Sequence, residues 1–167
     1  MDVQNGRRRW GLCLWALGFV TAALVTPASA EATITISHPP TEPPTFIDNG
    51  APGESVGDVR IFQFDATGED GGVVRTDWIM TTTGIDTPEK NVDSRITLGV
   101  FAFDSQLNDQ LLLQGVAFYP KEGATLAVSS STIRAIIGGT GKFSGASGWV
   151  ESRHLDDGSW EHVFHIR

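Results

Sequence analysis

The last segment of the chain, residues 160–166 (WEHVFHI), carries the residues best suited to chemistry. A β-strand here places Trp160, His162 and Phe164 on one face, because side chains alternate across a strand. That face is the more apolar one, so we predict that it points inward. A histidine in such a position can exchange a proton near neutral pH. His162 is therefore a candidate general acid or base, against the alternative of a structural histidine with satisfied hydrogen bonds.

The preceding segment, residues 148–154 (GWVESRH), is expected to pair with this strand as a hairpin. The dipeptide Asp157-Gly158 between them is a strong turn signal. A two-residue turn at this dipeptide directs Trp149, Glu151 and Arg153 inward. We adopt this register, which predicts that the carboxylate of Glu151, the guanidinium of Arg153 and a histidine share an aromatic cavity.

A three-residue turn is the alternative, and it directs Val150, Ser152 and His154 inward. A register change of one residue reverses both faces of a strand. In the adopted register His154 and His165 face solvent. Because His162 and His165 differ by three positions, they lie on opposite faces of a strand, which argues against a shared zinc ion. We therefore predict no metal site.

Other single residues are also candidates for the site. Tyr119, the only tyrosine, could hydrogen-bond an oxyanion or cap the barrel end. Asp77 could point inward and act as an acid or base with a raised pKa, or point outward beside Arg75. Trp149 and Trp160 could shape a hydrophobic pocket or fill the core.

The first thirty residues have the pattern of a secretory signal peptide. Arg7, Arg8 and Arg9 precede an apolar run at 10–25, and Ala28-Ser29-Ala30 is a small-residue cleavage site. The only cysteine, Cys13, lies in this segment, so the exported chain is expected to have no disulfide and no thiol nucleophile. We expect a secreted or periplasmic protein with no membrane span.

The rest of the chain is expected to form one domain with an acidic surface. The sequence has 20 acidic and 12 basic residues and a net charge of −8, and cleavage of the signal removes three arginines but only one aspartate. Such a chain repels nucleic acids and anionic lipids. We therefore expect no nucleic-acid partner.

No segment after residue 30 has a helical period, and short strands joined by turn signals predict an all-β fold. Residues 31–57 comprise a first strand at 32–37 and a proline-rich segment that is either a lid or a tether. Residues 58–167 comprise the remaining strands, at 58–66, 73–83, 95–103, 110–119, 124–128, 132–137, 148–154 and 159–166. This spacing favours an antiparallel up-and-down barrel or a sandwich, and a closed barrel leaves no edge strands.

Five glycines lie within residues 135–150 (AIIGGTGKFSGASGWV). Gly141-Lys142 lacks the glycine and the hydroxyl residue of a phosphate-binding Walker loop. Ser144 occupies the position where a dinucleotide fingerprint needs its third glycine. The glycines are therefore expected to bend a strand and to let two backbones approach closely.

Residues 138–148 resemble the GGTG-x-F-x-x-A-x-G signature of dirigent proteins and the GGSG-x-F-x-G-x-x-G segment of allene oxide cyclases. Gly57-Asp58-Val59 and Leu113-Gln114-Gly115 are similar to two strands of the cyclases, and they occur in the same order. Phe64-Asp65 with Val74-Arg75 is similar to segments of dirigent proteins. The resemblance covers roughly residues 55–166, nearly the whole exported chain.

The resemblance implies a single eight-stranded barrel with an apolar cavity, commonly a trimer, whose members act on hydrophobic substrates without a cofactor. It implies a cofactor-free isomerase or cyclase, and such a cavity lowers a barrier mainly by orienting the substrate. A non-catalytic guide or carrier for a hydrophobic molecule and a structural homotrimer with a filled barrel are the alternatives. The candidate substrate contacts are Trp149, Trp160, Phe164 and Gln114.

The family's catalytic residues do not carry over. The exported chain has no cysteine, Phe64 lies near the position of the cyclases' asparagine, and Ser147 replaces the arginine that follows the glycine corner of dirigent proteins. Any catalysis must therefore use other residues, for which the candidates are His162, Glu151, Arg153, Tyr119 and Asp77.

Overall fold

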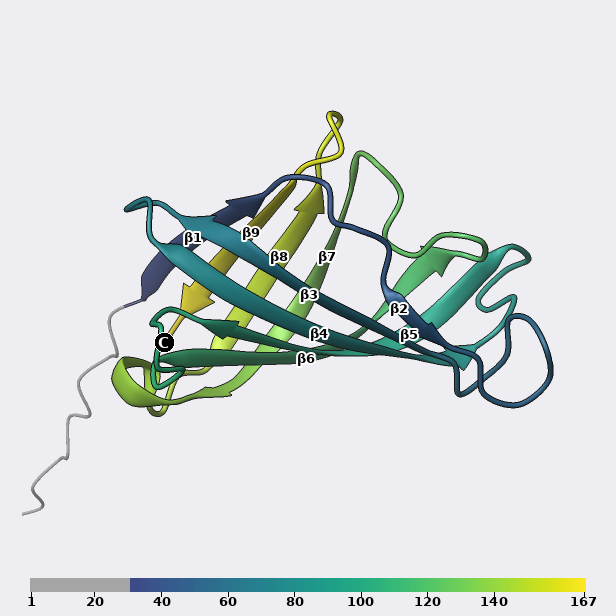
Figure 1. Ribbon diagram of the computed structural model, residues 1–167, viewed down its shortest axis with the longest axis horizontal. Helices are drawn as coiled ribbons and strands as arrows, with labels where there is room; N and C mark the ends of the chain where they lie inside the picture. The colour runs from purple at the N-terminus through teal and green to yellow at the C-terminus, as the bar shows by residue number, and fades with distance from the viewer. Residues whose placement is uncertain (1–30) are drawn as a thin grey trace, which may run out of the picture.

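The computed structural model describes residues 31–167, which form a closed antiparallel β-barrel (Figure 1). The expected signal peptide, including Cys13, lies outside the described residues. Eight strands close the barrel, as predicted: β1 (Ala32–His38), β3 (Val59–Gly68), β4 (Val73–Gly84), β5 (Val92–Ala102), β6 (Gln110–Pro120), β7 (Ser130–Gly139), β8 (Gly148–His154) and β9 (Trp160–Ile166).

Closure depends on β1, which pairs with β9 along its whole length and with β3 at one end. The pairs Ile36–Gly68 and Ser37–Thr67 complete the ring. The far end of β3 carries an additional short strand, β2 (Thr45–Ile47), within the proline-rich segment. This strand was not predicted. Prolines flank it in sequence, and they are tolerated there because β2 lies at a sheet edge.

The expected strand at 124–128 was wrong. This segment is a loop between β6 and β7, and its Leu126 side chain packs into the core with 6% of its surface exposed. The backbone carbonyls of Gly123 and Ala124 accept hydrogen bonds from the Arg95 guanidinium instead of from a neighbouring strand. The loop therefore covers one part of the barrel interior.

One part of the interior is tightly packed with apolar side chains. Phe101, Leu111, Leu113, Val150 and Phe164 are fully buried there. The rings of Phe101 and Phe164 meet edge to face with centroids 4.9 Å apart. Burial of each such side chain contributes about 1.5–3 kcal/mol. The barrel is therefore closed in this region, and any cavity must lie beyond it.

The glycine-rich stretch joins β7 to β8 through a short 3₁₀ turn, η1 (Gly141–Phe143). Gly148 begins β8 at a φ of +132°, and a Cβ there would collide with the backbone carbonyl of His165 on β9. Only glycine allows this conformation together with this approach. The expectation that the cluster permits close backbone contact is confirmed.

Candidate functional site

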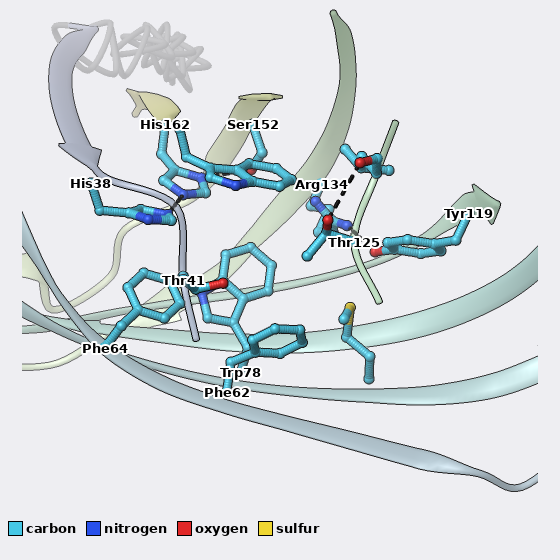
Figure 2. Close-up of a pocket in the computed structure, with 13 residues that line it drawn as sticks. His38, Thr41, Phe62, Phe64, Trp78, Tyr119, Thr125, Arg134, Ser152 and His162 are labelled. Atoms are coloured by element: carbon cyan, nitrogen blue, oxygen red, sulfur yellow. Dashed lines mark hydrogen bonds between the residues drawn. The ribbon is translucent and has the colours of Figure 1, made fainter. Parts of the chain in front are cut away.

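A pocket opens inside the barrel where the packed core ends (Figure 2). Aromatic rings from β3, β4 and β9 line it, and the proline-rich segment and the loop after β6 cover it through Thr41 and Leu126. Counted out to its mouth, the pocket holds about 420 Å³ of empty space, of which about 50 Å³ is wide enough for water. At about 10–15 Å³ for each water, that part admits only a few waters. A ligand larger than these few waters therefore needs some of the lining residues to move.

The hairpin formed by β8 and β9 supplies one wall of this pocket, and its register differs from the one we adopted. Ser152 lies opposite His162, and His154 lies opposite Trp160. Gly158 has a φ of +83° and follows two turn residues, and the Leu155 amide donates to the Ser159 carbonyl across the turn. This is the three-residue turn with a left-handed glycine at its end.

The register directs Val150, Ser152 and His154 inward, so the predicted inward positions of Trp149, Glu151 and Arg153 were wrong. The Arg153 guanidinium binds the carboxylates of Glu151 and Glu161 at 2.6 and 2.9 Å on the outer face. The Trp149 ring stacks on His165 with centroids 3.7 Å apart, also outside the barrel.

His162 does point inward, as predicted, and only 2% of its surface is exposed. Its Nδ1 lies 2.8 Å from the Ser152 hydroxyl oxygen. Its Nε2 lies 3.2 Å from the Nε2 of His38, the last residue of β1. The two histidines are 124 positions apart in sequence, and closure of the barrel brings them together.

One carbonyl oxygen determines the direction of this hydrogen-bond chain. The Pro39 carbonyl lies 2.7 Å from His38 Nδ1, and because a carbonyl only accepts, His38 Nδ1 carries the proton. In a neutral ring His38 Nε2 then accepts, so His162 Nε2 donates to it. His162 Nδ1 must therefore accept from the Ser152 hydroxyl. The result is a directional chain from Ser152 through His162 and His38 to the backbone.

Both rings favour the neutral form, because the pKa of each is lowered. Burial lowers the pKa of His162 well below its usual value, and the neighbouring His38 and Arg134 lower it further through charge repulsion. Burial is also the main cause of the lowered pKa of His38. Desolvation disfavours the charged form of an imidazole. The pocket therefore presents a neutral imidazole pair.

A second polar group in the pocket combines Tyr119 with Arg134, which lies on β7. An Arg134 Nη2–H donates to the Tyr119 hydroxyl at 2.6 Å, and the Thr97 hydroxyl lies 3.3 Å from the same oxygen. Tyr119 is thus buried inside the barrel. Two roles of Tyr119 stay predictions: its hydroxyl binds an oxyanion of the substrate, or the residue caps the barrel end.

The other predicted site residues lie apart from the pocket, with one exception. Trp160 lines it beside His162. Phe164 is buried in the packed core and does not reach the pocket. Gln114 is exposed on the outer face of β6, so its predicted place as a substrate contact was wrong. Asp77 points outward, where it binds Arg75 at 3.5 Å and accepts from Gln63.

Several residues of the pocket were not predicted as site residues, among them His38 and Arg134. His38 continues the inward series of Ile34 and Ile36 at the end of β1, so alternation alone could have indicated its direction. Arg134 is the only charge in the apolar run IRAII at 133–137. A single charge on the inward face of such a strand is a recognisable signal.

Within residues 31–167, no three histidine, aspartate or glutamate side chains gather as potential metal ligands. No helix in that range is long and apolar enough to cross a membrane.

Comparison with known proteins supports the fold but not a family. No family model matches the chain, and no curated protein matches it. A solved structure named pyocyanin demethylase is similar, with a TM-score of 0.60 and 17% sequence identity over 83% of this chain and 100% of that one. At this identity the likeness shows a shared barrel fold alone. The resemblance to allene oxide cyclases and dirigent proteins stays a prediction.

Proposed function

We propose that the barrel binds a small, largely apolar molecule in its pocket and transfers a proton on it, as a cofactor-free isomerase or cyclase. The observation that carries this proposal is the neutral His38–His162 pair, which Ser152 and the Pro39 carbonyl orient at the wall of an aromatic pocket. Neutral imidazoles with defined donor and acceptor nitrogens are suited to acid–base catalysis.

The two imidazole nitrogens that face each other have complementary roles. A substrate that separates the rings would meet the His162 Nε2–H as a donor and the His38 Nε2 as an acceptor. His38 would remove a proton from the substrate and return it to another atom, while His162 donates to the oxygen that gains negative charge. The proton is conserved and no electrons are exchanged, so this isomerisation needs no redox partner.

The aromatic lining supplies the binding contacts for such a substrate. Phe62, Phe64, Trp78 and Trp160 surround the histidines, and the Trp78 and His162 rings lie 5.6 Å apart. Rigid rings hold an apolar molecule in one orientation, and orientation alone can account for several kcal/mol of a barrier. The pocket therefore offers both positioning and proton transfer.

A non-catalytic guide or carrier is the second candidate, and a specific observation favours it. Both ring nitrogens of His162 already have hydrogen-bond partners, as expected for a structural histidine. A guide needs only the shape of the pocket. The empty space beside His162 argues against the third possibility, a completely filled barrel.

Deuterium exchange into 2-indanone, a small aromatic ketone with acidic C–H groups, tests the proposal. We expect the protein (residues 31–167) to accelerate exchange in D₂O, followed by NMR, and expect H38Q and H162Q to lower the rate at least 100-fold while binding persists. H165Q, a matched change on the outer face, should leave the rate unchanged. Binding without exchange would favour the guide, and absence of both would overturn the proposal.

We also propose that the barrel assembles as the predicted homotrimer. Ile61, Ile79 and Leu98 form an exposed apolar row across the outer faces of β3, β4 and β5, where each is paired with the next. Exposed apolar rows on soluble barrels often mark contact surfaces. Light scattering should give three times the chain mass, and I79K should reduce it to one. A wild-type monomer would contradict this assembly.

A further inference from the structure

Arg134 is a buried cation without a buried anion. Only 3% of its surface is exposed, and it forms no ion pair with any carboxylate in the described part of the chain. Its polar contact is the Tyr119 hydroxyl, and its guanidinium carbon lies 5.2 Å from the centre of the Trp78 ring. Buried charges in proteins are normally paired. An unpaired one inside a pocket therefore points to a partner that arrives with the ligand.

The pocket wall also holds two buried hydrogen-bond donors without partners among residues 31–167. They are the Nε–H of Arg134 and the Nε1–H of Trp78. Both residues line the same pocket, and Figure 2 shows Arg134 directed toward Tyr119 above the Trp78 side chain. Neither group can accept a hydrogen bond. The open positions on this wall thus call for acceptor atoms.

We propose that the ligand of this pocket carries an anionic oxygen, as in a carboxylate or a deprotonated enol, that binds against Arg134 and Trp78. This inference rests on the proposed function and narrows its substrate class to small aromatic or apolar acids. A carboxylate only accepts hydrogen bonds, and it suits a guanidinium better than any other side-chain cation. The aromatic rings would hold the apolar body of the same molecule.

Arg134 is held firmly enough to act as such an anchor. Tyr119 receives its Nη2–H, Thr97 contacts the Tyr119 hydroxyl, and the Arg95 guanidinium lies over the Tyr119 ring at 4.7 Å. A fixed guanidinium loses little conformational freedom when it binds an anion. The charge of Arg134 also acts on His162, whose pKa it lowers. An anion bound at Arg134 would offset that effect, so binding should raise the pKa of His162.

Phenylacetate and phenylacetamide test the inference, because they have nearly the same shape and differ in charge. We expect the protein (residues 31–167) at pH 7 to bind phenylacetate at least tenfold more tightly by calorimetry. Phenylacetate alone should raise the pKa of His162 in an NMR titration. R134Q should abolish the preference, and R134K, which keeps the charge without the Nε donor, should retain part of it. R75Q makes the same charge change on the outer face and should retain the full preference for phenylacetate.

The outcomes separate this inference from the proposed function. Equal affinity for the two probes, or an unchanged preference in R134Q, would overturn the anion site while the apolar pocket and its proton transfer stand. Failure of both probes to bind would overturn the proposed function and this inference with it. The wild-type comparison needs no variant, so it decides the question even if R134Q does not fold.

Discussion

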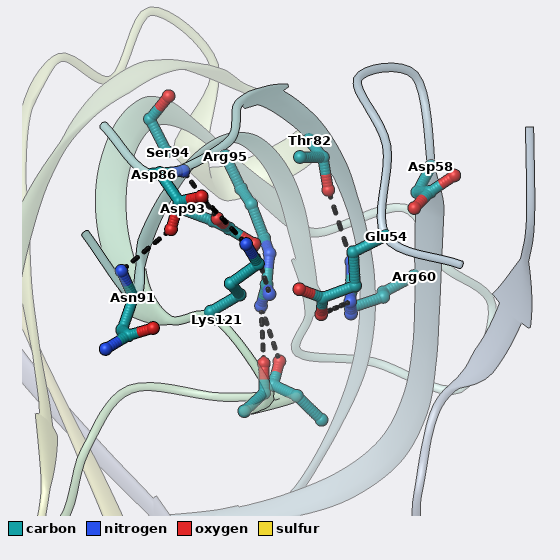
Figure 3. A network of polar contacts seen from close by, with 12 residues as sticks. Glu54, Asp58, Arg60, Thr82, Asp86, Asn91, Asp93, Ser94, Arg95 and Lys121 are labelled. Atoms are coloured by element: carbon teal, nitrogen blue, oxygen red, sulfur yellow. Dashed lines mark hydrogen bonds and ion pairs between the residues drawn. The ribbon is translucent and has the colours of Figure 1, made fainter. Parts of the chain in front are cut away.

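The barrel interior contains a second cluster of buried charges, and its composition differs from that of the pocket (Figure 3). Arg95 donates to the Gly123 carbonyl at 2.8 Å, and its Nη2 lies 3.9 Å from a carboxylate oxygen of Asp93. Arg60 binds Glu54 at 3.1 Å. Two cations therefore face two anions in this cluster, whereas Arg134 faces none.

The buried atoms without hydrogen-bond partners show the same contrast between the second cluster and the pocket. In the second cluster two donors of Arg95 and one acceptor each on Asp93 and Glu54 lack partners, so the open atoms balance. Water, which both donates and accepts, can complete such a group. At the pocket both open atoms are donors. The comparison indicates that charge balance separates a structural network from a ligand site in this barrel.

The largest expected effect is on stability. R95M should lower the free energy of unfolding by about 3–5 kcal/mol, because it leaves the buried Asp93 carboxylate without its cation. R134M should cost no more than about 1–2 kcal/mol, because Tyr119 keeps Thr97 as a partner and no anion is left behind. Urea denaturation measures both, with R75M on the outer face as control. Equal losses for R95M and R134M would remove the distinction between the two regions.

Low pH should decrease the stability of the folded protein because of the two histidines in the pocket. The pKa values of His38 and His162 are lowered in the folded state, so below about pH 6.5 the unfolded chain binds protons that the folded chain does not. Stability is therefore full above that pH and falls below it, by about 1.4 kcal/mol per pH unit for each such proton. Denaturation midpoints from pH 8 to 5 should show a shallower loss in H162Q than in the wild type, while H165Q should follow the wild type.

The contribution of the second cluster to stability should change with pH in the opposite direction. Burial, and then the charge of Asp93, raises the pKa of the Glu54 carboxyl above its usual 4.5. The folded state then binds this proton more tightly than the unfolded chain, so its contribution to stability grows as the pH falls through the folded pKa toward 4.5. E54Q removes this term, and its stability should fall more steeply than that of the wild type at acid pH. An identical pH curve for E54Q would contradict the assignment.

The smallest effect is expected on the outer face. Arg153 is half exposed between Glu151 and Glu161, and ion pairs of this kind are screened by water. R153Q should leave ligand binding and proton transfer unchanged and should alter stability within the error of denaturation experiments. A large loss of binding in R153Q would show that the outer face takes part in the site.

Alternation along single strands could be predicted from the sequence. The inward faces of Trp160, His162 and Phe164 follow from a period of two, which depends only on local backbone geometry. The different surroundings of these three side chains do not follow from this period. Trp160 and His162 reach the pocket, while Phe164 packs against Phe101, because the two neighbourhoods are formed by strands distant in sequence.

The register of the last hairpin was decided by one glycine. Asp157-Gly158 correctly indicated a turn, but the left-handed Gly158 ends a three-residue loop and does not form half of a two-residue one. This difference of one residue moved Glu151 and Arg153 outside and Ser152 inside. Local signals located the turn, but they did not distinguish a two-residue loop from a three-residue one.

By itself, the sequence determined that this chain is an all-β protein with hairpin turns, a glycine-rich corner and a histidine on an inward face. These features depend on side-chain period and backbone conformation, which act between near neighbours. Only the tertiary structure decided that His38 meets His162 and that Arg134 is buried beside Trp78 without an anion. These meetings arise because β1 closes the barrel against β9 and β3, and no local preference encodes which distant strands pair.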